Sequence, residues 1–254
     1  MIKSEVKITS VFSCEGITKN YEGKAVVKDI SLRLPIGGFI SLLGPSGAGK
    51  TTIFNVLAGV DLPDNGRVFL ADEDITGVSG KVSYMLQKDL LLEYRTVLDN
   101  VILPLLIKGV KKKEAREQAA AYFPQFGLSG YEKKYPRQLS GGMRQRAALL
   151  RTCMTHNNVI LLDEPFSALD AITRRLMQNW YTGIAASLGL STFFITHDVD
   201  EALLLSDEVY ILNGNPGVIS CRFEVSPARP HSAEFALSAE FATQKRFILE
   251  AIGV

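Results

Sequence analysis

The sequence predicts an α/β fold with a mainly parallel β-sheet, and three observations favour it. Short runs of large apolar residues, typical of strands buried on both faces, alternate with segments of helical periodicity. A glycine-rich loop joins the first of these runs to a helix. A stretch of about 88–140 shows helical patterns and no convincing strand, so we expect an α-helical subdomain inserted into the core.

The elements follow in order along the chain. The first forty-odd residues alternate apolar and polar positions between glycine turns, which predicts an N-terminal antiparallel β subdomain with one solvated face. The expected buried strands are 39–43, 159–162, 192–196 and 208–212. The expected helices are 50–58, 97–107, 112–126, 141–154, 171–188 and 239–252. One or two edge strands should follow residue 217, and we divide the chain into a main domain, 8–225, and a C-terminal extension, 226–254.

Composition excludes several classes of protein. The 254 residues are 46% hydrophobic and 22% charged with a formal net charge of +1, so no global electrostatic signature for nucleic acid is present. The run Lys111–Lys113 stands beside acidic residues and is interpreted as a solvated helix start. No apolar stretch approaches the roughly 18 residues that a membrane-spanning helix needs. Three widely separated cysteines disfavour a zinc site or disulfide framework and suit a reducing cytosol.

The glycine-rich loop carries the strongest chemical signal. It matches the pattern G-x-x-x-x-G-K-[ST] with Gly44, Pro45, Ser46, Gly47, Ala48, Gly49, Lys50 and Thr51, and Thr52 follows it. Glycines allow backbone N–H groups to wrap closely around a polyphosphate, and the helix that follows presents its N-terminal dipole to the same anion. Lys50 should reach the β- and γ-phosphates, and the hydroxyl of Thr51 should be a ligand of Mg²⁺.

Two carboxylates end the expected strand 159–162. In an open α/β sheet, ligands bind beyond the carboxyl ends of the strands, where the glycine-rich loop also lies. Asp163 can therefore contribute to the Mg²⁺ shell, and Glu164 can orient and polarise an attacking water.

Further motifs give the chain a resemblance to a known family. Leu139-Ser140-Gly141-Gly142-Met143-Arg144-Gln145-Arg146 resembles the LSGGQ signature of ABC-type ATPases, whose fold is a P-loop NTPase core. Tyr21 resembles the aromatic residue that stacks on adenine, Gln87 the Q-loop glutamine, Ser167-Ala168-Leu169-Asp170 the D-loop, and His197 the switch histidine. The likeness extends over roughly residues 8–212.

The resemblance implies a nucleotide site shared by two chains. Each ATP would lie between the glycine-rich loop of one chain and the Ser140, Gly141 and Gly142 region of the other, which opens a helix with a serine cap. Glu164 would activate water, His197 would contact the γ-phosphate, and Gln87 would bind Mg²⁺ or water and signal to the helical insertion. Asp170, in the D-loop, is included among the nucleotide-binding residues. His156 and His231 carry no such pattern and are interpreted as structural.

Two segments resemble importers of the nitrate, sulfonate, taurine and pyrimidine-precursor group. These are the segment after Gln87 and the tail Pro227-Ala228-Arg229-Pro230, although Glu93-Tyr94 replaces the usual Pro-Trp. The expected partners are a separate transmembrane permease, a periplasmic or lipoprotein solute-binding protein, and a second copy of the chain, with no nucleic acid. The expected location is the cytoplasmic face of the membrane. The solute and the symmetry of the permease stay open, and an exporter remains an alternative.

Other classes with the same ATPase head fit less well. A DNA-repair ATPase would need long coiled-coil arms between Lys50 and Leu139, and this segment has no sustained heptads. A translation factor would need two fused heads, and a non-enzymatic regulator would be expected to lack Lys50 or Glu164, both of which are present.

Overall fold

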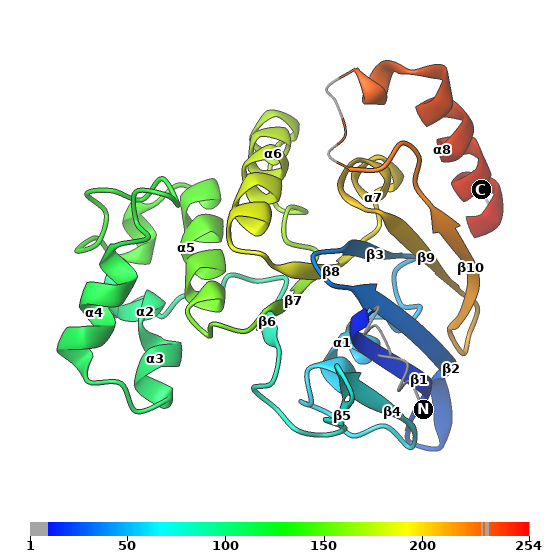
Figure 1. Cartoon of the computed structure of the whole chain (residues 1–254), viewed down its shortest axis with the longest axis horizontal. Coiled ribbons are helices and arrows are strands. Elements are labelled where there is room, and N and C mark those ends of the chain that lie inside the picture. Colours follow the sequence, from blue (N-terminus) through cyan, green and yellow to red (C-terminus); the bar gives the residue numbers. More distant parts are fainter. Residues whose placement is uncertain (1–9, 230, 232–233, 254) are drawn as a thin grey trace, which may run out of the picture. The chain divides into compact units, whose positions relative to one another are not determined.

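The computed structural model describes residues 10–229, 231 and 234–253, and the chain packs as two units. Unit 1 comprises Met1–Lys81 and Leu190–Val254, and unit 2 comprises Val82–Gly189. Residues 8 and 9 of the proposed main domain and Pro230 of the tail motif lie outside the described residues. Figure 1 gives the elements of both units in chain colours.

Unit 1 contains an antiparallel sheet, as the alternating N-terminal pattern predicts. Its strand order is β2-β1-β4-β5. The strands are β1 (Ser10–Tyr21), β2 (Lys24–Pro35), β4 (Asn65–Leu70) and β5 (Glu73–Asp74). β4 and β5 were not expected from the sequence, because their outward polar residues and Gly66 leave only a weak alternation.

A mainly parallel set of strands also lies in unit 1, in the order β10-β9-β3-β8. β3 (Phe39–Leu43) runs parallel to both β8 (Ser191–Thr196) and β9 (Glu208–Asn213). β10 (Val218–Glu224) pairs antiparallel with β9 and is the expected edge strand. All residues of β3 and β8 are buried, which explains why these strands are apolar throughout and do not alternate.

The helices of unit 1 cover these strands. They are α1 (Lys50–Leu57), α7 (Val199–Leu205) and α8 (Ala239–Ile252), with a short 3₁₀ turn at Phe235–Leu237. The C-terminal α8 packs on α7 and β9. The apolar cluster in this region includes Leu203, Ile211, Phe241 and Ile248. The expected final helix is therefore confirmed, whereas α7 was not predicted because it is only seven residues long.

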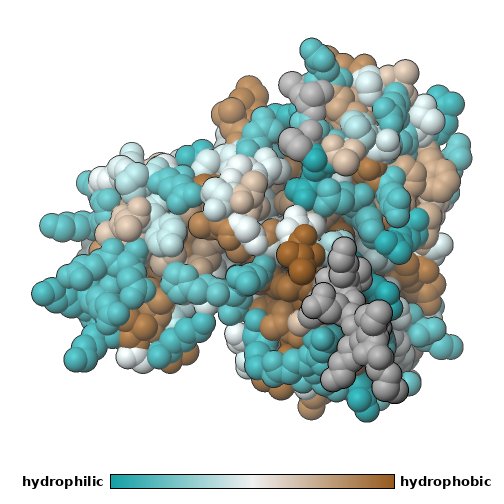
Figure 2. All heavy atoms as spheres, in the orientation of Figure 1, coloured by the Kyte–Doolittle hydropathy of each residue, from teal (hydrophilic) through white to brown (hydrophobic). Residues whose placement is uncertain are grey.

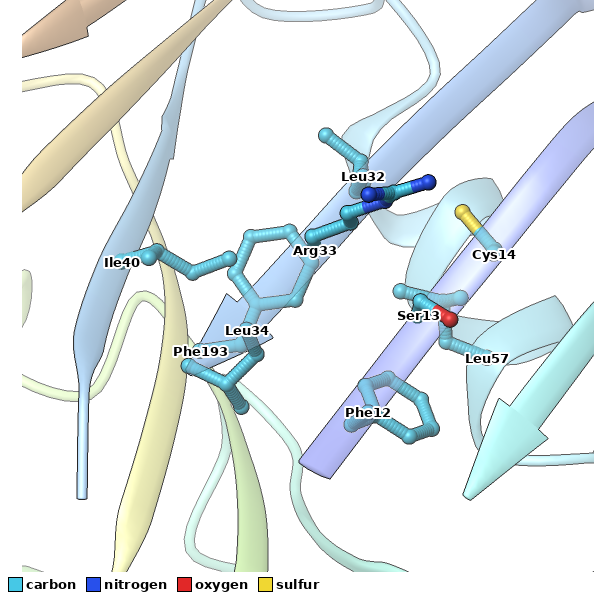
Figure 3. A pocket seen from close by; sticks show the side chains of 9 residues that line it. All are labelled: Phe12, Ser13, Cys14, Leu32, Arg33, Leu34, Ile40, Leu57 and Phe193. Carbon is cyan, nitrogen blue, oxygen red and sulfur yellow. The ribbon is translucent and has the colours of Figure 1, made fainter. Parts of the chain in front are cut away.

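The core beneath the antiparallel sheet is tightly filled. Side chains from β1, β2, β3, β8 and α1 converge there (Figure 3), and they include Phe12, Leu34, Ile40, Leu57 and Phe193. The crevice between them has no room for a water molecule, so it is a packing feature and not a ligand site. Cys14 lines this crevice, and burial raises the pKa of its thiol to about 12, as expected for an unreactive core cysteine.

Unit 2 contains the parallel pair β6 (Ser83–Met85) and β7 (Val159–Asp163) and the helical insertion. Its helices are α2 (Val97–Val101), α3 (Leu103–Ile107), α4 (Lys112–Ala120), α5 (Gly141–Cys153) and α6 (Ala171–Ser187), with a 3₁₀ turn at Pro136–Gln138. The described part of 87–140 contains no strand, as predicted.

Two expected helices of the insertion are shorter than the sequence pattern indicates. Pro104 has no N–H to donate to Asn100, so the expected helix 97–107 breaks into α2 and α3 at Ile102. Pro124 has the same effect on the expected helix 112–126, since its ring would clash with the carbonyl of Ala120, where α4 ends.

The surface over α4 is hydrophilic in Figure 2. Lys112 and Arg116 form ion pairs with Asp99 at 3.6 and 2.8 Å. This arrangement agrees with a solvated helix face. Among the described residues, no helix combines the length and apolar character required to cross a bilayer.

Candidate nucleotide-binding and hydrolysis residues

The glycine-rich loop, residues 44–52, leaves the buried strand β3 and enters α1. Gly44 runs directly against β9, where a Cβ atom would lie 2.3 Å from the carbonyl oxygen of Leu212. Gly47 and Gly49 adopt φ angles of +81° and +98°, in the left-handed region that favours glycine. The loop therefore requires glycine at these positions for both space and conformation.

The start of α1 has the properties of an anion site. Gly49 is its N-cap, so no side chain caps the first N–H groups, and its first turn carries no acidic residue. The positive end of the helix dipole is therefore not neutralised from within this helix. Ser46 and Gly47 in the preceding loop are exposed, as is Thr51 in the first turn.

Lys50 is only 6% exposed. Its Nζ donates to the carbonyl oxygens of Gly44 and Pro45 at 2.7 and 2.9 Å. Burial of an ammonium group is costly unless it is hydrogen-bonded, so the loop carbonyls stabilise it at the centre of the glycine-rich loop.

Tyr21 lies at the end of β1 with 42% of its surface exposed. Its hydroxyl donates to Asp61, and it also interacts with the side chain of Thr52 on α1. The hydrogen bond to Asp61 is the main cause of a raised pKa for the Tyr21 hydroxyl. The structure thus places this aromatic ring beside the helix that begins at the glycine-rich loop.

His197 is exposed and follows β8 directly. The residues on either side of it are fixed by hydrogen bonds: Thr196 Oγ1 accepts from the N–H of Asp198 at 3.0 Å and donates to the buried carboxylate of Glu201. Asp198 in turn caps α7 by accepting from two backbone N–H groups. Glu201 belongs to no motif of the sequence, and only the fold brings it to Thr196.

In unit 2, Gln87 and Glu164 are in direct contact. Gln87 Nε2 donates to Glu164 Oε2 at 3.0 Å. Glu164 has a φ of +45°, a conformation that costs a non-glycine residue about 1–3 kcal/mol. The backbone N–H and hydroxyl of Ser167 donate to the Glu164 carbonyl, which holds the strained turn in place. Strain of this kind, retained at the end of a buried strand, is typical of functional positions.

Asp163, the last residue of β7, is 4% exposed. Tyr84 on the neighbouring β6 hydrogen-bonds to it, and burial together with the Asp163 charge raises the pKa of the Tyr84 hydroxyl. Tyr84 belongs to no motif of the sequence. Its place beside Asp163 follows from the pairing of β6 with β7, which sets Tyr84 opposite Leu161.

Ser140 caps the helix α5, as the signature-like sequence predicts. Its Oγ accepts from the N–H of Met143 at 3.3 Å. Gly142 approaches α6 so closely that a Cβ would lie 3.2 Å from Thr173 Cγ2, and Ser140 and Gly141 are exposed. The exposed start of α5 is thus held against α6.

Asp170 caps α6 and accepts from the N–H groups of Ile172 and Thr173 at 3.1 and 3.0 Å. These hydrogen bonds, led by that from Thr173, lower the pKa of its carboxyl group. In this structure Asp170 is therefore a helix cap at the start of α6.

The segment after Gln87 is anchored to α5 by two arginines, in contacts that no sequence motif indicates. Arg144 Nε pairs with Asp89 Oδ2 at 3.2 Å. Arg151 donates to the carbonyl oxygens of Asp89 and Leu90. Both arginines project from α5, so the residues beside Gln87 are tied to the helix that Ser140 caps.

A sequence model of the ABC transporter family matches residues 27–167, which include the glycine-rich loop, the Ser140 region and both strand-end carboxylates. The chain belongs to the ABC transporter family. It is an importer-type ATP-binding subunit and an ABC-type ATPase, as the sequence resemblance implied.

Several relatives match three quarters or more of the chain. An uncharacterised ABC transporter ATP-binding protein of Methanocaldococcus jannaschii is 38% identical over 98% of this chain and 93% of its own length. The formylaminopyrimidine import ATP-binding protein ThiZ of Halalkalibacterium halodurans is 42% identical, covering 75% and 74% of the two chains. The taurine import ATP-binding protein TauB of Pseudomonas aeruginosa is 39% identical, covering 88% and 87%.

Solved structures of the family share the fold. A dimeric ATP-binding cassette in a post-hydrolysis state with ADP and Pi is 26% identical, with a TM-score of 0.73 over 84% of this chain and 98% of that one. A nucleotide-free cassette reaches a TM-score of 0.76 at 22% identity, covering 85% and 92%. The P-loop NTPase core expected from the sequence is therefore confirmed for this ABC subunit.

Proposed function

We propose that ATP is bound by residues 44–52 of the glycine-rich loop with its base on Tyr21. The observation that carries this proposal is the start of α1, where glycines at fixed conformations, a helix N-terminus with no side-chain cap and the buried Lys50 lie together. A triphosphate supplies the negative charge that such a helix end favours. Lys50 would then exchange its loop carbonyls for phosphate oxygens, which are stronger acceptors.

The residues assigned to Mg²⁺ are Thr51, Gln87 and Asp163. They offer a hydroxyl, an amide oxygen and a carboxylate, all of them the hard oxygen donors that Mg²⁺ prefers. Mg²⁺ usually keeps several waters and is bound through one or two carboxylates together with the phosphates of the nucleotide. When bound, the ion would offset charge on the β- and γ-phosphates.

Hydrolysis is assigned to Glu164, Gln87 and His197. Glu164 would orient a water for in-line attack and accept its proton, and the amide of Gln87 would hold the Glu164 carboxylate in place. His197 would donate to the γ-phosphate at the end of β8. These roles are supported by the hydrogen bond between the two side chains in unit 2 and by the fixed backbone on both sides of His197.

The dimeric form of the related cassette supports the same arrangement here. Two copies would close on ATP, with the N-terminus of α5 (Ser140, Gly141 and Gly142) facing the triphosphate held by the other copy. Asp170, at the start of α6, would lie in the same interface. Removal of the γ-phosphate would then allow the dimer to open.

The transported solute is proposed as a sulfonate, nitrate, taurine or a thiamine-precursor pyrimidine. Relatives near 40% identity are named for taurine and formylaminopyrimidine import, which supports this group. A separate membrane permease and a periplasmic or lipoprotein solute-binding protein would complete the system. The chain would act at the cytoplasmic face of the membrane, with residues 8–225 as the ATPase domain and 226–254 as an extension.

Calorimetry tests the nucleotide site. The Lys50→Ala variant should lose measurable binding of ATP, and the Lys28→Ala variant, which changes an exposed lysine of β2, should retain it. Unchanged ATP affinity in the Lys50→Ala variant would refute the assignment.

An uptake assay tests the identity of the solute. A strain that lacks this gene is complemented with the wild-type chain or with the Glu164→Gln variant, and its uptake of labelled taurine, nitrate and formylaminopyrimidine is measured. Restoration of uptake by the wild type alone for one of these compounds is the expected result, and no difference for any of them would refute the proposed group.

A further inference from the structure

The ring of Tyr21 is fixed by two charged neighbours that belong to no motif in the sequence. We call Lys19, Tyr21 and Asp61 the β1-end cluster. The Tyr21 hydroxyl donates to Asp61 Oδ2, and Lys19 Nζ lies 2.9 Å from Asp61 Oδ1. Lys19 also donates to the carbonyl oxygen of Leu62 at 2.7 Å. Both oxygens of the Asp61 carboxylate are therefore occupied by the cluster itself.

The loop that carries Asp61 directly follows α1 and is hydrogen-bonded to its last turn. The N–H groups of Val60 and Asp61 both donate to the carbonyl oxygen of Asn55, at 2.9 and 3.1 Å. Asp64, three residues further on, donates its N–H to the Thr18 carbonyl and accepts from the N–H of Asn20. The end of β1 is thus tied to the helix that starts at the glycine-rich loop, and the position of Tyr21 relative to that loop is fixed.

The two faces of the Tyr21 ring are not equivalent. Lys19 Nζ lies over one face, 5.1 Å from the ring centroid, at the range of a cation–π contact. The ring is still 42% exposed, so a planar group can approach it. Because the Lys19 ammonium occupies one face of the Tyr21 ring, a planar group would stack on the opposite face.

We propose that Asp61 and Lys19 are positioning residues for the nucleotide base. They hold the Tyr21 ring at a set distance from the phosphate site and reserve the face opposite Lys19 for a purine. This inference rests on the proposed nucleotide role of Tyr21. Because the ring is already ordered before the base arrives, the entropic cost of fixing it is removed from the binding step.

Comparison of two ligands separates a base effect from general damage. ATP carries the base, and inorganic tripolyphosphate carries only the phosphate chain. The Asp61→Ala variant should bind ATP about tenfold more weakly, which lies within the range of one base–aromatic stack, and should bind tripolyphosphate as the wild type does. Tyr21→Phe, which keeps the ring and loses only the hydroxyl, should show a smaller loss of the same kind. Asp72→Asn, an exposed acid of the same unit outside the cluster, is the matched control.

The outcomes are distinguishable. Suppose that Tyr21→Ala weakens the binding of ATP but not of tripolyphosphate, and that Asp61→Ala causes no further loss in the double variant. The two residues then act through one ring, as proposed. If Tyr21→Ala weakens ATP binding and Asp61→Ala does not, the positioning role is wrong while the proposed function stands. If Tyr21→Ala itself leaves ATP affinity unchanged, the base site assigned under the proposed function fails as well. Equal losses for ATP and tripolyphosphate in Asp61→Ala would show structural damage and overturn the inference.

Discussion

The side-chain amide of Gln87 donates a 3.0 Å hydrogen bond to Oε2 of Glu164, across 77 positions of sequence. The two residues reach each other because β6 runs parallel to β7. Gln87 and Glu164 each follow the carboxyl end of one of these strands, so they lie at the same edge of the pair. Arg144 and Arg151 fix the residues after Gln87 on α5. A proposed catalytic carboxylate is therefore linked, within unit 2, to the helix capped by Ser140.

This contact makes Glu164→Gln an informative substitution. The new amide can still accept from Gln87, so the geometry is retained while the basic oxygen is lost. We expect ATP hydrolysis to fall at least about 100-fold with ATP binding kept, since a general base contributes about 10²–10⁴. Size-exclusion chromatography with ATP and Mg²⁺ should then show a trapped dimer. Glu117→Gln on the exposed face of α4 should behave as the wild type, and hydrolysis at the wild-type rate in Glu164→Gln would disprove the base assignment.

The glycine-rich loop predicts a contrast between two glycine substitutions. Gly44→Ala places a methyl group 2.3 Å from the Leu212 carbonyl oxygen, so it should destabilise the fold by about 1–3 kcal/mol. Gly183→Ala, within α6 and with nothing within 4 Å of the added Cβ, should stabilise it by about 1 kcal/mol. Thermal unfolding of both variants measures the difference. A neutral Gly44→Ala variant would contradict the close approach of the loop to β9.

The hydroxyl of Thr196, the residue before His197, donates to Glu201 and accepts from the N–H of Asp198, the residue after His197. Thr196→Val keeps the shape but leaves both partners without this bridge, so we expect about a tenfold fall in kcat, equivalent to about 1.4 kcal/mol. Thr196→Ser should restore most of the rate. Steady-state kinetics of the two variants and of the double variant with His197→Ala provide the check. Additive losses in the double variant would mean that Thr196 does not act through His197.

The stability contributed by Asp61 should depend on pH in a defined direction. Hydrogen bonds from Tyr21 and then Lys19 lower its pKa in the folded state, so the ionised carboxylate stabilises the fold above the unfolded pKa near 4. That contribution is lost as the pH falls through the lowered folded pKa. The difference in Tm between the wild type and Asp61→Asn should therefore be constant from about pH 6 to 8 and shrink below about pH 4. A difference that grows on acidification would contradict this sign.

Much of the fold follows from local pattern. The buried strands, the helical insertion and α8 could be predicted because burial on two faces, helical periodicity and serine or glycine caps are local properties of the sequence. The breaks at Ile102 and Ala120 have local causes too, in Pro104 and Pro124, and the periodic pattern alone missed them. β4 and β5 could not be predicted, because the pairing of β4 with β1 and of β5 with β4 decides them more than their own composition does.

The chemistry of the glycine-rich loop and the order of the family motifs are set by the sequence alone, since each depends on residues close together in the chain. Tertiary structure decided the rest: Tyr84 beside Asp163, Glu201 beneath Thr196, and Lys19 and Asp61 around Tyr21. Strand pairing and loop closure bring together side chains that are up to dozens of positions apart. No spacing rule specifies such neighbours, because they are selected by burial and hydrogen bonding over the whole unit.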